Sequence, residues 1–311
     1  MSVPNWNVAP SNAADHTGGD GLRHRWGVWK KIFSTALSER LVYRGDFALG
    51  TLMRFLPIVT QIFLWWAVFD AIADQPVAPD AAGEAPPEAA SETQIGDFSF
   101  PDIVAYYLLT MIARAFSSMP GLASGIALQI REGEIKRYLI QPIDLIGFLL
   151  LNRVAHKFAY YVIACLPFAL VFYLCRDYFV TGFPPAHQFI AFLGSLVMAF
   201  LIGFFLEAAI GMIGFWFLEV SSLLFLYMLF SFFLSGHMFP LTLLPEPIET
   251  IVQFLPLKYL AYFPAAVFLG KVPEEDLPME MLIEALWLAF FIIVCRVAYS
   301  RGVARYSGFG G

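Results

Sequence analysis

Charged residues are scarce in this chain, so the places where they gather are the places where polar chemistry is available. Five of the seven residues in REGEIKR, from Arg131 to Arg137, are charged, and long apolar runs lie on both sides. The preceding residues LASGIALQI favour a mildly amphipathic helix that ends at Pro142, because proline lacks an N–H and disfavours helical geometry in the residue before it. Asp144 can then cap the next helix. A short charged helix of this kind suits docking into a groove of another protein.

Four charges lie in or at the ends of apolar runs, at Arg54, Arg114, Glu207 and Glu219. An unpaired charge inside a bilayer costs a few kcal/mol, so each needs a partner or a function. Two interpretations of Arg114 stand: it faces a substrate path and attracts an anionic head group, or it snorkels or pairs with an acid on a neighbouring span. Glu207 and Glu219 flank an apparent turn and are expected at the membrane interface.

No pattern in the sequence indicates a catalytic or metal site. The three cysteines all lie in apolar runs without a CxxC spacing, which gives neither a disulfide framework nor a zinc site. His156 and His237 have no partners at ligand spacing. We therefore expect no catalytic residue, no metal and no cofactor in this chain.

The composition indicates an integral membrane protein. Of 311 residues, 59% are hydrophobic and only 14% are charged, whereas a soluble domain needs about a quarter charged. No cleavable signal peptide is visible in the first 48 residues. The net charge of -6 argues against a nucleic-acid partner, because no basic stripe is available to neutralise phosphates.

The apolar runs predict an all-α membrane protein with six transmembrane helices, because a spanning helix needs about 20 mostly apolar residues. The predicted spans are Leu49–Phe69, Ile103–Met119, Phe158–Cys175, Gln188–Leu206, Val220–Gly236 and Met281–Tyr299. The second span is short and is interrupted by Arg114. The apolar piece Ala208–Leu218 has only 11 residues and is interpreted as a tight turn between the fourth and fifth spans.

The distribution of basic residues predicts the orientation. With six spans both termini share a side, and fourteen Lys and Arg residues fall on that side against three on the other. The positive-inside rule then places both termini in the cytoplasm, together with the REGEIKR stretch.

The remaining segments are read from their composition. Residues 1–25 are hydrophilic and expected to be disordered, and residues 26–48 alternate apolar and basic positions at helical spacing. The latter pattern indicates an interfacial helix on the cytoplasmic surface, with an ordinary cytosolic helix as the alternative. Residues 49–311 are then a single transmembrane domain.

Two segments are expected outside the cytoplasm. Residues 74–102 contain seven acids, no Lys or Arg and an Ala/Pro-rich middle, which is typical of a flexible spacer or, alternatively, of a docking loop. Residues 237–280 contain seven prolines between short apolar pieces, so they are expected to form short re-entrant or cap helices over the outer end of the bundle. This cap could serve as a gate or as packing. The predicted gate residues are Gly236, Phe239, Pro240 and Pro245.

Three motifs resemble one protein family. IREGEIKRYLIQPID is similar to a segment of bacterial ATP-binding-cassette permeases of the type-2 exporter class, in particular the six-span ABC-2 family transporter group. SGHMFPLTLLPEPIETIVQFLPLKYLAYFPAAVFLGK resembles the outer segment of that group, and the tail RVAYSRGVARYSGFGG resembles its terminus. The resemblance covers about residues 25 to 311. The hydrophilic first 25 residues and the long acidic loop depart from it.

The resemblance implies the permease half of an exporter in the bacterial inner membrane. Two such chains, identical or not, would assemble among membrane lipids with two cytoplasmic ATPase subunits that bind ATP and Mg. This chain has no G-x-x-x-x-G-K-[ST] loop, since its one Gly-Lys pair, Gly270-Lys271, is followed by valine. Residues 129–139 would form the coupling helix and residues 26–45 the elbow helix. The coupling residues would be Gln129, Arg131, Glu132, Glu134, Lys136 and Arg137.

Two other functions remain as alternatives. A secondary transporter or channel would need no ATPase, but should show an internal inverted repeat or broken mid-membrane helices with paired ionisable groups. A membrane scaffold would use the acidic loop for docking.

Overall fold

The computed structural model describes residues 18–42, 44–74, 94–141, 143–180, 182–217 and 219–306. The predicted disordered segment up to residue 17, residues 75–93 of the acidic loop and Pro142 lie outside the described residues. Side chains of residues 18–25, of residues 39–52 and of Arg54 are likewise not described.

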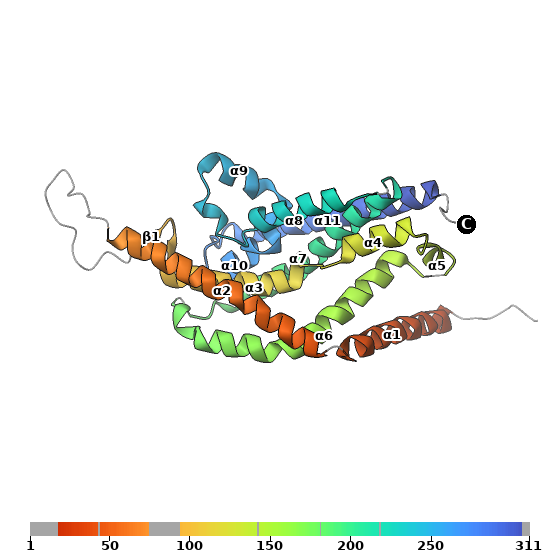
Figure 1. Ribbon diagram of the computed structural model, residues 1–311, viewed down its shortest axis with the longest axis horizontal. Coiled ribbons are helices and arrows are strands. Elements are labelled where there is room, and N and C mark those ends of the chain that lie inside the picture. The colour runs from red at the N-terminus through yellow and green to blue at the C-terminus, as the bar shows by residue number, and fades with distance from the viewer. Residues whose placement is uncertain are drawn as a thin grey trace, which may run out of the picture.

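The described chain is an elongated bundle of helices (Figure 1). Five helical segments are long and apolar enough to cross a membrane: Phe55–Ala73, Phe100–Arg131, Leu145–Leu174, Ala186–Phe215 and Leu277–Arg305. The sixth predicted span corresponds to α8 (Ser221–Leu234), an apolar helix of only 14 residues. The expectation of a mostly helical membrane protein is confirmed, with five helices that meet the length of a span and one shorter helix.

Helix α7 (Ala186–Met212) lies at the centre of the bundle, between α11 (Leu277–Arg305) and the pair α3 (Phe100–Ser117) and α4 (Leu122–Arg131). Glycines bring the backbones together: a methyl group at Gly203 would lie 2.1 Å from the carbonyl oxygen of Ser117. At Gly211 it would lie 2.9 Å from the carbonyl oxygen of Ala123. Small residues at such contacts allow close helix packing in membranes.

The prediction of a tight turn over Ala208–Leu218 is wrong. Helix α7 continues to Met212, and η2 (Ile213–Phe215) extends it by one short 3₁₀ turn. The segment stays helical because it packs closely against α4: a methyl group placed at Gly214 would lie only 3.1 Å from Ala127 Cα. Only the residues after Phe215 turn the chain toward α8.

The second span is broken near its end. Helix α3 ends at Ser117, Ser118 is extended, and Gly121 adopts a left-handed conformation with φ of 74° before α4 begins. Two cations on α6 (Leu145–Leu174) cover the carbonyl groups that the break leaves open. Lys157 Nζ donates to the carbonyls of Ala115 and Ser118, the latter at 2.6 Å, and Arg153 Nη1 donates to that of Pro120 at 3.2 Å. Cations are favourable at a helix C-terminus, where the dipole is negative.

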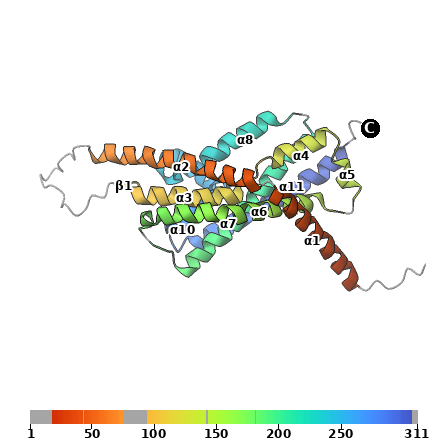
Figure 2. The same cartoon turned by 60° about the horizontal axis from the view of Figure 1, so that its bottom comes forward.

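The N-terminal helix is separate from the first span. Helix α1 (Gly18–Val42) projects from the bundle (Figure 2), and α2 (Arg44–Ala73) follows it. The helix therefore starts eight residues earlier than predicted, within a segment expected to be disordered. It packs on α6, with the rings of Phe33 and Phe158 6.3 Å apart. Its placement on a membrane surface remains a prediction.

The proline-rich residues 237–280, called the cap below, form short helices as expected. They are η3 (Leu241–Leu243), α9 (Glu246–Phe254), η4 (Pro256–Leu260) and α10 (Tyr262–Phe268). The cap lies at one end of the bundle, and α5 (Lys136–Leu139) lies near the other (Figure 1). None of these cap helices is long enough to span.

Part of the expected flexible loop is folded against the cap. Residues Gln94–Ile95 (β1) and Phe98–Ser99 (β2) pair in a small antiparallel hairpin. Lys271 of the cap donates to the backbone carbonyl of Asp97 at 2.6 Å and forms an ion pair with Asp102 at 2.9 Å. The end of the acidic segment is thus fixed by a cation that lies far along the sequence.

A short 3₁₀ turn, η1 (Arg176–Tyr178), follows α6 in the connection to α7.

Candidate functional site

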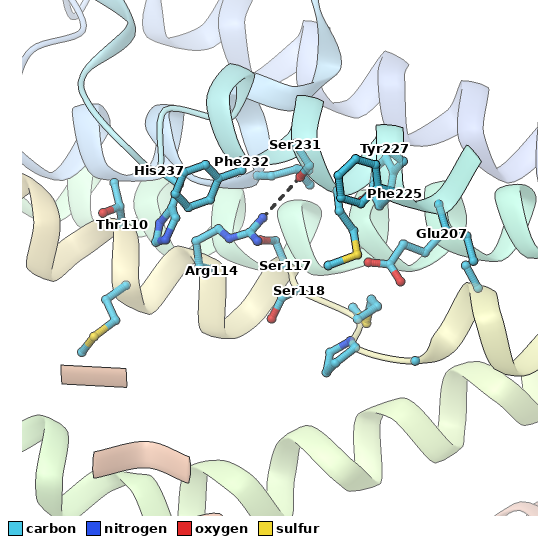
Figure 3. Close-up of a pocket in the computed structure, with 18 of the residues that line it drawn as sticks. Thr110, Arg114, Ser117, Ser118, Glu207, Phe225, Tyr227, Ser231, Phe232 and His237 are labelled. Atoms are coloured by element: carbon cyan, nitrogen blue, oxygen red, sulfur yellow. Dashed lines mark hydrogen bonds between the residues drawn. The ribbon is translucent and has the colours of Figure 1, made fainter. Parts of the chain in front are cut away.

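A pocket of about 960 Å³ opens beside the break between α3 and α4 (Figure 3). Its walls come from α2, α3, the start of α4 and α8, and one residue each is added by α7, η4 and the turn after α8. The polar side chains that line it are those of Gln61, Tyr107, Thr110, Arg114, Ser117, Ser118, Ser124, Glu207, Ser221, Tyr227, Ser231 and His237. The pocket therefore contains polar groups although the helices that form it are largely apolar.

Arg114 is the basic residue of the pocket wall. It lies in the last turn of α3, and its Nη1 donates to Ser231 Oγ on α8 at 3.4 Å. Figure 3 shows the guanidinium between α3 and α8, pointing toward Ser231. Both interpretations made from the sequence stay open: Arg114 lines a cavity, and its charge also acts on the carboxylate of Glu207 on the neighbouring α7. Its part in a substrate path remains a prediction.

Glu207 is the acidic residue of the same pocket, which the sequence did not indicate. We expected it at the membrane interface beside a turn, but α7 continues past it and carries its carboxylate to the α3–α4 break. Burial disfavours the charged form of this carboxylate, whereas the positive charges of Arg153, Arg114 and Lys157 and the backbone N–H of Met119 favour it. The turn expected over residues 208–218 put Glu207 at the membrane interface, so its position in the pocket was not predicted.

Two further polar groups of the pocket have hydrogen-bonding atoms without a partner among the described residues. Ser117 is 2% exposed, and its Oγ makes no hydrogen bond. His237 Nδ1 makes none either. Burial and the nearby charge of Arg114 lower the pKa of His237 to about 4, so its imidazole is neutral at pH 7. Buried polar groups are normally satisfied, so these atoms give the pocket unused hydrogen-bonding capacity.

The entrance of the pocket is apolar. Phe225 and Met228 on α8 are 65% and 67% exposed, and Pro57 on α2 is exposed on the facing side. Ile58 and Met111 lie deeper and are buried. The pocket thus combines a polar inner wall with an apolar rim.

The predicted coupling segment has a different local structure from the one expected. Helix α4 ends at Arg131, Gly133 adopts φ of 79°, and the four-residue helix α5 begins at Lys136. The charges therefore lie on a turn between two helices, called the charged turn (residues 131–137), rather than on one continuous helix. Glycine in a left-handed conformation ends a helix because it carries no Cβ, and this signal was present in the sequence.

The charged turn presents most of its side chains to solvent. Arg131, Glu132, Glu134 and Arg137 are exposed, whereas Lys136 and Gln129 are half-buried. Arg137 pairs with Glu134 at 3.4 Å, and Arg131 lies 3.8 Å from Glu219. Ile135 is 1% exposed and fixes the turn to the bundle, while the carbonyl of Gln129 accepts a hydrogen bond from its N–H at 3.1 Å. The six predicted coupling residues are therefore brought together at one end of the molecule.

The predicted gate residues lie where α8 meets the cap. Gly236 has φ of 76°, and its carbonyl accepts a hydrogen bond from Tyr106 on α3. Tyr107 donates to the carbonyl of Met238 and accepts from Trp65 Nε1 at 2.7 Å. The sequence indicated Gly236 but not the two tyrosines, which lie about 130 positions away. Adjacent tyrosines inside an apolar run were the available signal.

The other three gate residues do not share this contact. Phe239 is half-buried, Pro240 is buried at the start of η3, and Pro245 is exposed before α9. The structure therefore joins only Gly236 of the four to α3. Its role in gating remains a prediction.

Comparison with known families agrees with the motifs. A family model described as ABC-2 family transporter protein matches residues 89–310, which is well over half of the chain. The match includes the α3–α4 break, the charged turn and the cap. A comparison with curated proteins finds no match.

Proposed function

Because the chain belongs to the ABC-2 family of transporter proteins, which makes it a membrane permease of an ABC transporter, we propose that it is the permease subunit of an ATP-driven exporter. Two permease chains form the substrate path and take their energy from separate cytoplasmic ATPase subunits that bind ATP and Mg. The observation that carries this proposal is the charged turn, exposed at the end of the bundle opposite the cap.

The charged turn suits contact with a partner protein. Its ion pairs, Glu134–Arg137 and Arg131–Glu219, are exposed, and exposed pairs contribute little to stability. The same charges are then available to a complementary surface. Electrostatic complementarity at such a surface selects the partner and fixes its orientation.

Helix α4 offers a mechanical route from the turn to the pocket. It is a 10-residue helix whose buried face packs on α7, and its first residues line the pocket. A displacement of the turn by a closing ATPase dimer would move α4 against α7 at the α3–α4 break. The ATP-bound partner would thus bias the permease toward one of two conformations.

The proposed topology has six spans with both termini in the cytoplasm of a bacterial cell. Helix α8 serves as the fifth span, although 14 residues cover only about 21 Å. The excess of Lys and Arg on the side of the termini supports this orientation and places the cap outside.

Co-purification tests the proposal. The chain is expressed together with the ATPase encoded by a neighbouring gene, and a variant carries Glu132→Lys, Glu134→Lys, Lys136→Glu and Arg137→Glu. The variant should lose the ATPase during purification and should no longer stimulate ATP hydrolysis. A matched control, Glu274→Lys with Glu275→Lys, alters exposed charges in the cap and should retain both properties.

Two results would contradict the proposal. One is a charge-reversed variant that folds, binds the ATPase and stimulates it as the native chain does. The other is transport that continues in energised vesicles without ATP, which indicates a secondary transporter. Deleting residues 76–95 tests the scaffold alternative, since a scaffold loses its partner whereas an exporter still binds its ATPase.

A further inference from the structure

The inner wall of the pocket offers a binding position for an anionic group. Arg114 provides a guanidinium, and Ser117 provides a buried hydroxyl without a partner among the described residues. The N-terminus of α4 reaches the same pocket through Ala123 and Ser124, and no side chain caps it. A helix N-terminus and a guanidinium both favour anionic oxygens.

The same pocket offers a position for a cationic group. Glu207 comes from α7 and reaches the pocket beside the α3–α4 break (Figure 3). Two of the cations near it, Lys157 and Arg153, also donate to backbone carbonyls at that break. Its carboxylate can accept further hydrogen bonds, since an ionised carboxylate has about four lone-pair sites.

The balance of charge distinguishes between head groups. The pocket is lined by one basic and one acidic side chain, those of Arg114 and Glu207, whereas His237 is neutral at pH 7. A purely anionic head group would meet repulsion from Glu207, and a purely cationic one would meet repulsion from Arg114. In a site of low dielectric constant such repulsion weakens the binding of either head group. A head group with both charges meets neither penalty.

The apolar rim of the pocket can accommodate the apolar part of a ligand whose head group lies on the polar wall. The exposed faces of Phe225 and Met228 on α8 and of Pro57 on α2 lie at the edge of the pocket. At about 960 Å³ the pocket is at the large end of the range for small-molecule sites. An apolar chain can therefore leave along α8 and α2 while its head stays on the polar wall.

We propose that this pocket binds an amphiphile with a zwitterionic head group, whose anionic group contacts Arg114 and Ser117 and whose ammonium group contacts Glu207. The inference rests on the proposed function, for which it names the substrate class. The pocket holds the substrate at the α3–α4 break, where a movement of α4 changes its wall.

A binding experiment on the purified chain in maltoside micelles tests the inference. The probe is lysophosphatidylethanolamine with a fluorescent acyl chain. Lysophosphatidylglycerol with the same chain is the anionic comparator, and an alkylamine of equal length is the cationic one. The native chain should bind the ethanolamine lipid about tenfold more tightly than either comparator, because only this lipid engages both charges.

Variants of the pocket assign the two positions. Arg114→Gln should weaken binding of both phospholipids about tenfold and should tighten binding of the amine, which no longer meets a positive charge. Glu207→Gln should weaken binding of lysophosphatidylethanolamine and strengthen binding of lysophosphatidylglycerol. Glu274→Gln in the cap is the matched control and should change nothing. Thermal unfolding checks each variant; if Arg114→Gln does not fold, Ser117→Ala should weaken both phospholipids severalfold and leave the amine unaffected.

Several outcomes would overturn the inference. Equal affinity of the native chain for both phospholipids excludes a zwitterion, and unchanged binding by folded Arg114 and Glu207 variants excludes this pocket. Disulfide-linked dimers that form in membranes with a Met228→Cys chain but not with the native chain, whose Cys165 is also exposed, show, together with an absence of lipid binding, that a second copy occupies the pocket. Binding is measured without the ATPase, so failure here is distinct from failure of ATPase co-purification.

Discussion

Arg296 in the second half of α11 and Asp144 at the start of α6 form a two-pronged ion pair. Nη1 lies 2.6 Å from Oδ1 and Nη2 lies 2.9 Å from Oδ2. Asp144 also accepts a hydrogen bond from the N–H of Gly147 at 2.8 Å, so it caps α6 as the sequence predicted. One carboxylate thus begins the helix that follows the charged turn and ties that helix to the last span.

Substitutions at this pair should separate the contribution of the helix N-cap of α6 from that of the ion pair. Asp144→Asn keeps a good N-cap residue but loses the charge, whereas Asp144→Ala loses both. We expect Asp144→Asn to lower the free energy of unfolding by about 1 kcal/mol and Asp144→Ala by about 2 kcal/mol. Thermal unfolding in detergent measures both. Equal effects of the two substitutions would show that the N-cap hydrogen bond of Asp144 contributes nothing to stability. Arg296→Gln should lower the stability about as much as Asp144→Asn does.

The same pair predicts a dependence of stability on pH. Burial raises the pKa of Asp144, but hydrogen bonds from Arg296 and from the Gly147 N–H outweigh it and hold the pKa below its ordinary value. The unfolded chain therefore binds the proton more readily, so the stabilisation is complete above the ordinary aspartate pKa of about 4. It is lost as the pH falls through the lower, folded pKa. Unfolding temperatures of native and Arg296→Gln chains should converge toward acid pH; a constant difference would exclude this linkage.

The helices and their order were predictable because apolar run length and capping residues act locally. Asp144, the apolar runs and the prolines of the cap each indicated their element without reference to distant residues. The charged turn was also partly visible, since Gly133 inside a helical pattern is a recognised end signal. The predicted helix nevertheless extends past Gly133, because Pro142 is a stronger end signal later in the sequence.

The pocket could not be predicted because it depends on which helices pack together. Glu207 enters it only because Gly211 and Gly214 let α7 continue along α4. Lys157 reaches the carbonyl of Ser118 across 39 positions of sequence. No alternation of residue types within a single segment carries such information. Arg114 was indicated because a charge in an apolar run is rare, whatever its neighbours are.

Gly236 should tolerate no side chain. A methyl group there would lie 2.6 Å from Tyr262 Cβ, and the residue has φ of 76°. Gly182 is a matched control with φ of 72° and nothing within 4 Å of its methyl position. Gly182→Ala should cost only the conformational penalty of about 1–2 kcal/mol, whereas Gly236→Ala should also displace Tyr262 and abolish the folded monodisperse form. Size-exclusion profiles and unfolding temperatures compare them, and equal effects would contradict the packing argument.

Gly203 should be as restrictive, for a reason that involves two helices. Its methyl position lies 2.1 Å from the carbonyl oxygen of Ser117, a backbone atom that cannot move without shifting the end of α3. Gly194 on the same helix meets only the flexible end of Met281, at 3.3 Å. We expect Gly194→Ala to change the unfolding temperature little or to raise it, since alanine favours helices by about 1 kcal/mol over glycine. Gly203→Ala should push α7 away from the α3–α4 break and move Glu207 within the pocket, so it should lower both the unfolding temperature and the affinity for the ethanolamine lipid. A Gly203→Ala chain with native stability would show that α7 and α3 do not meet at this distance.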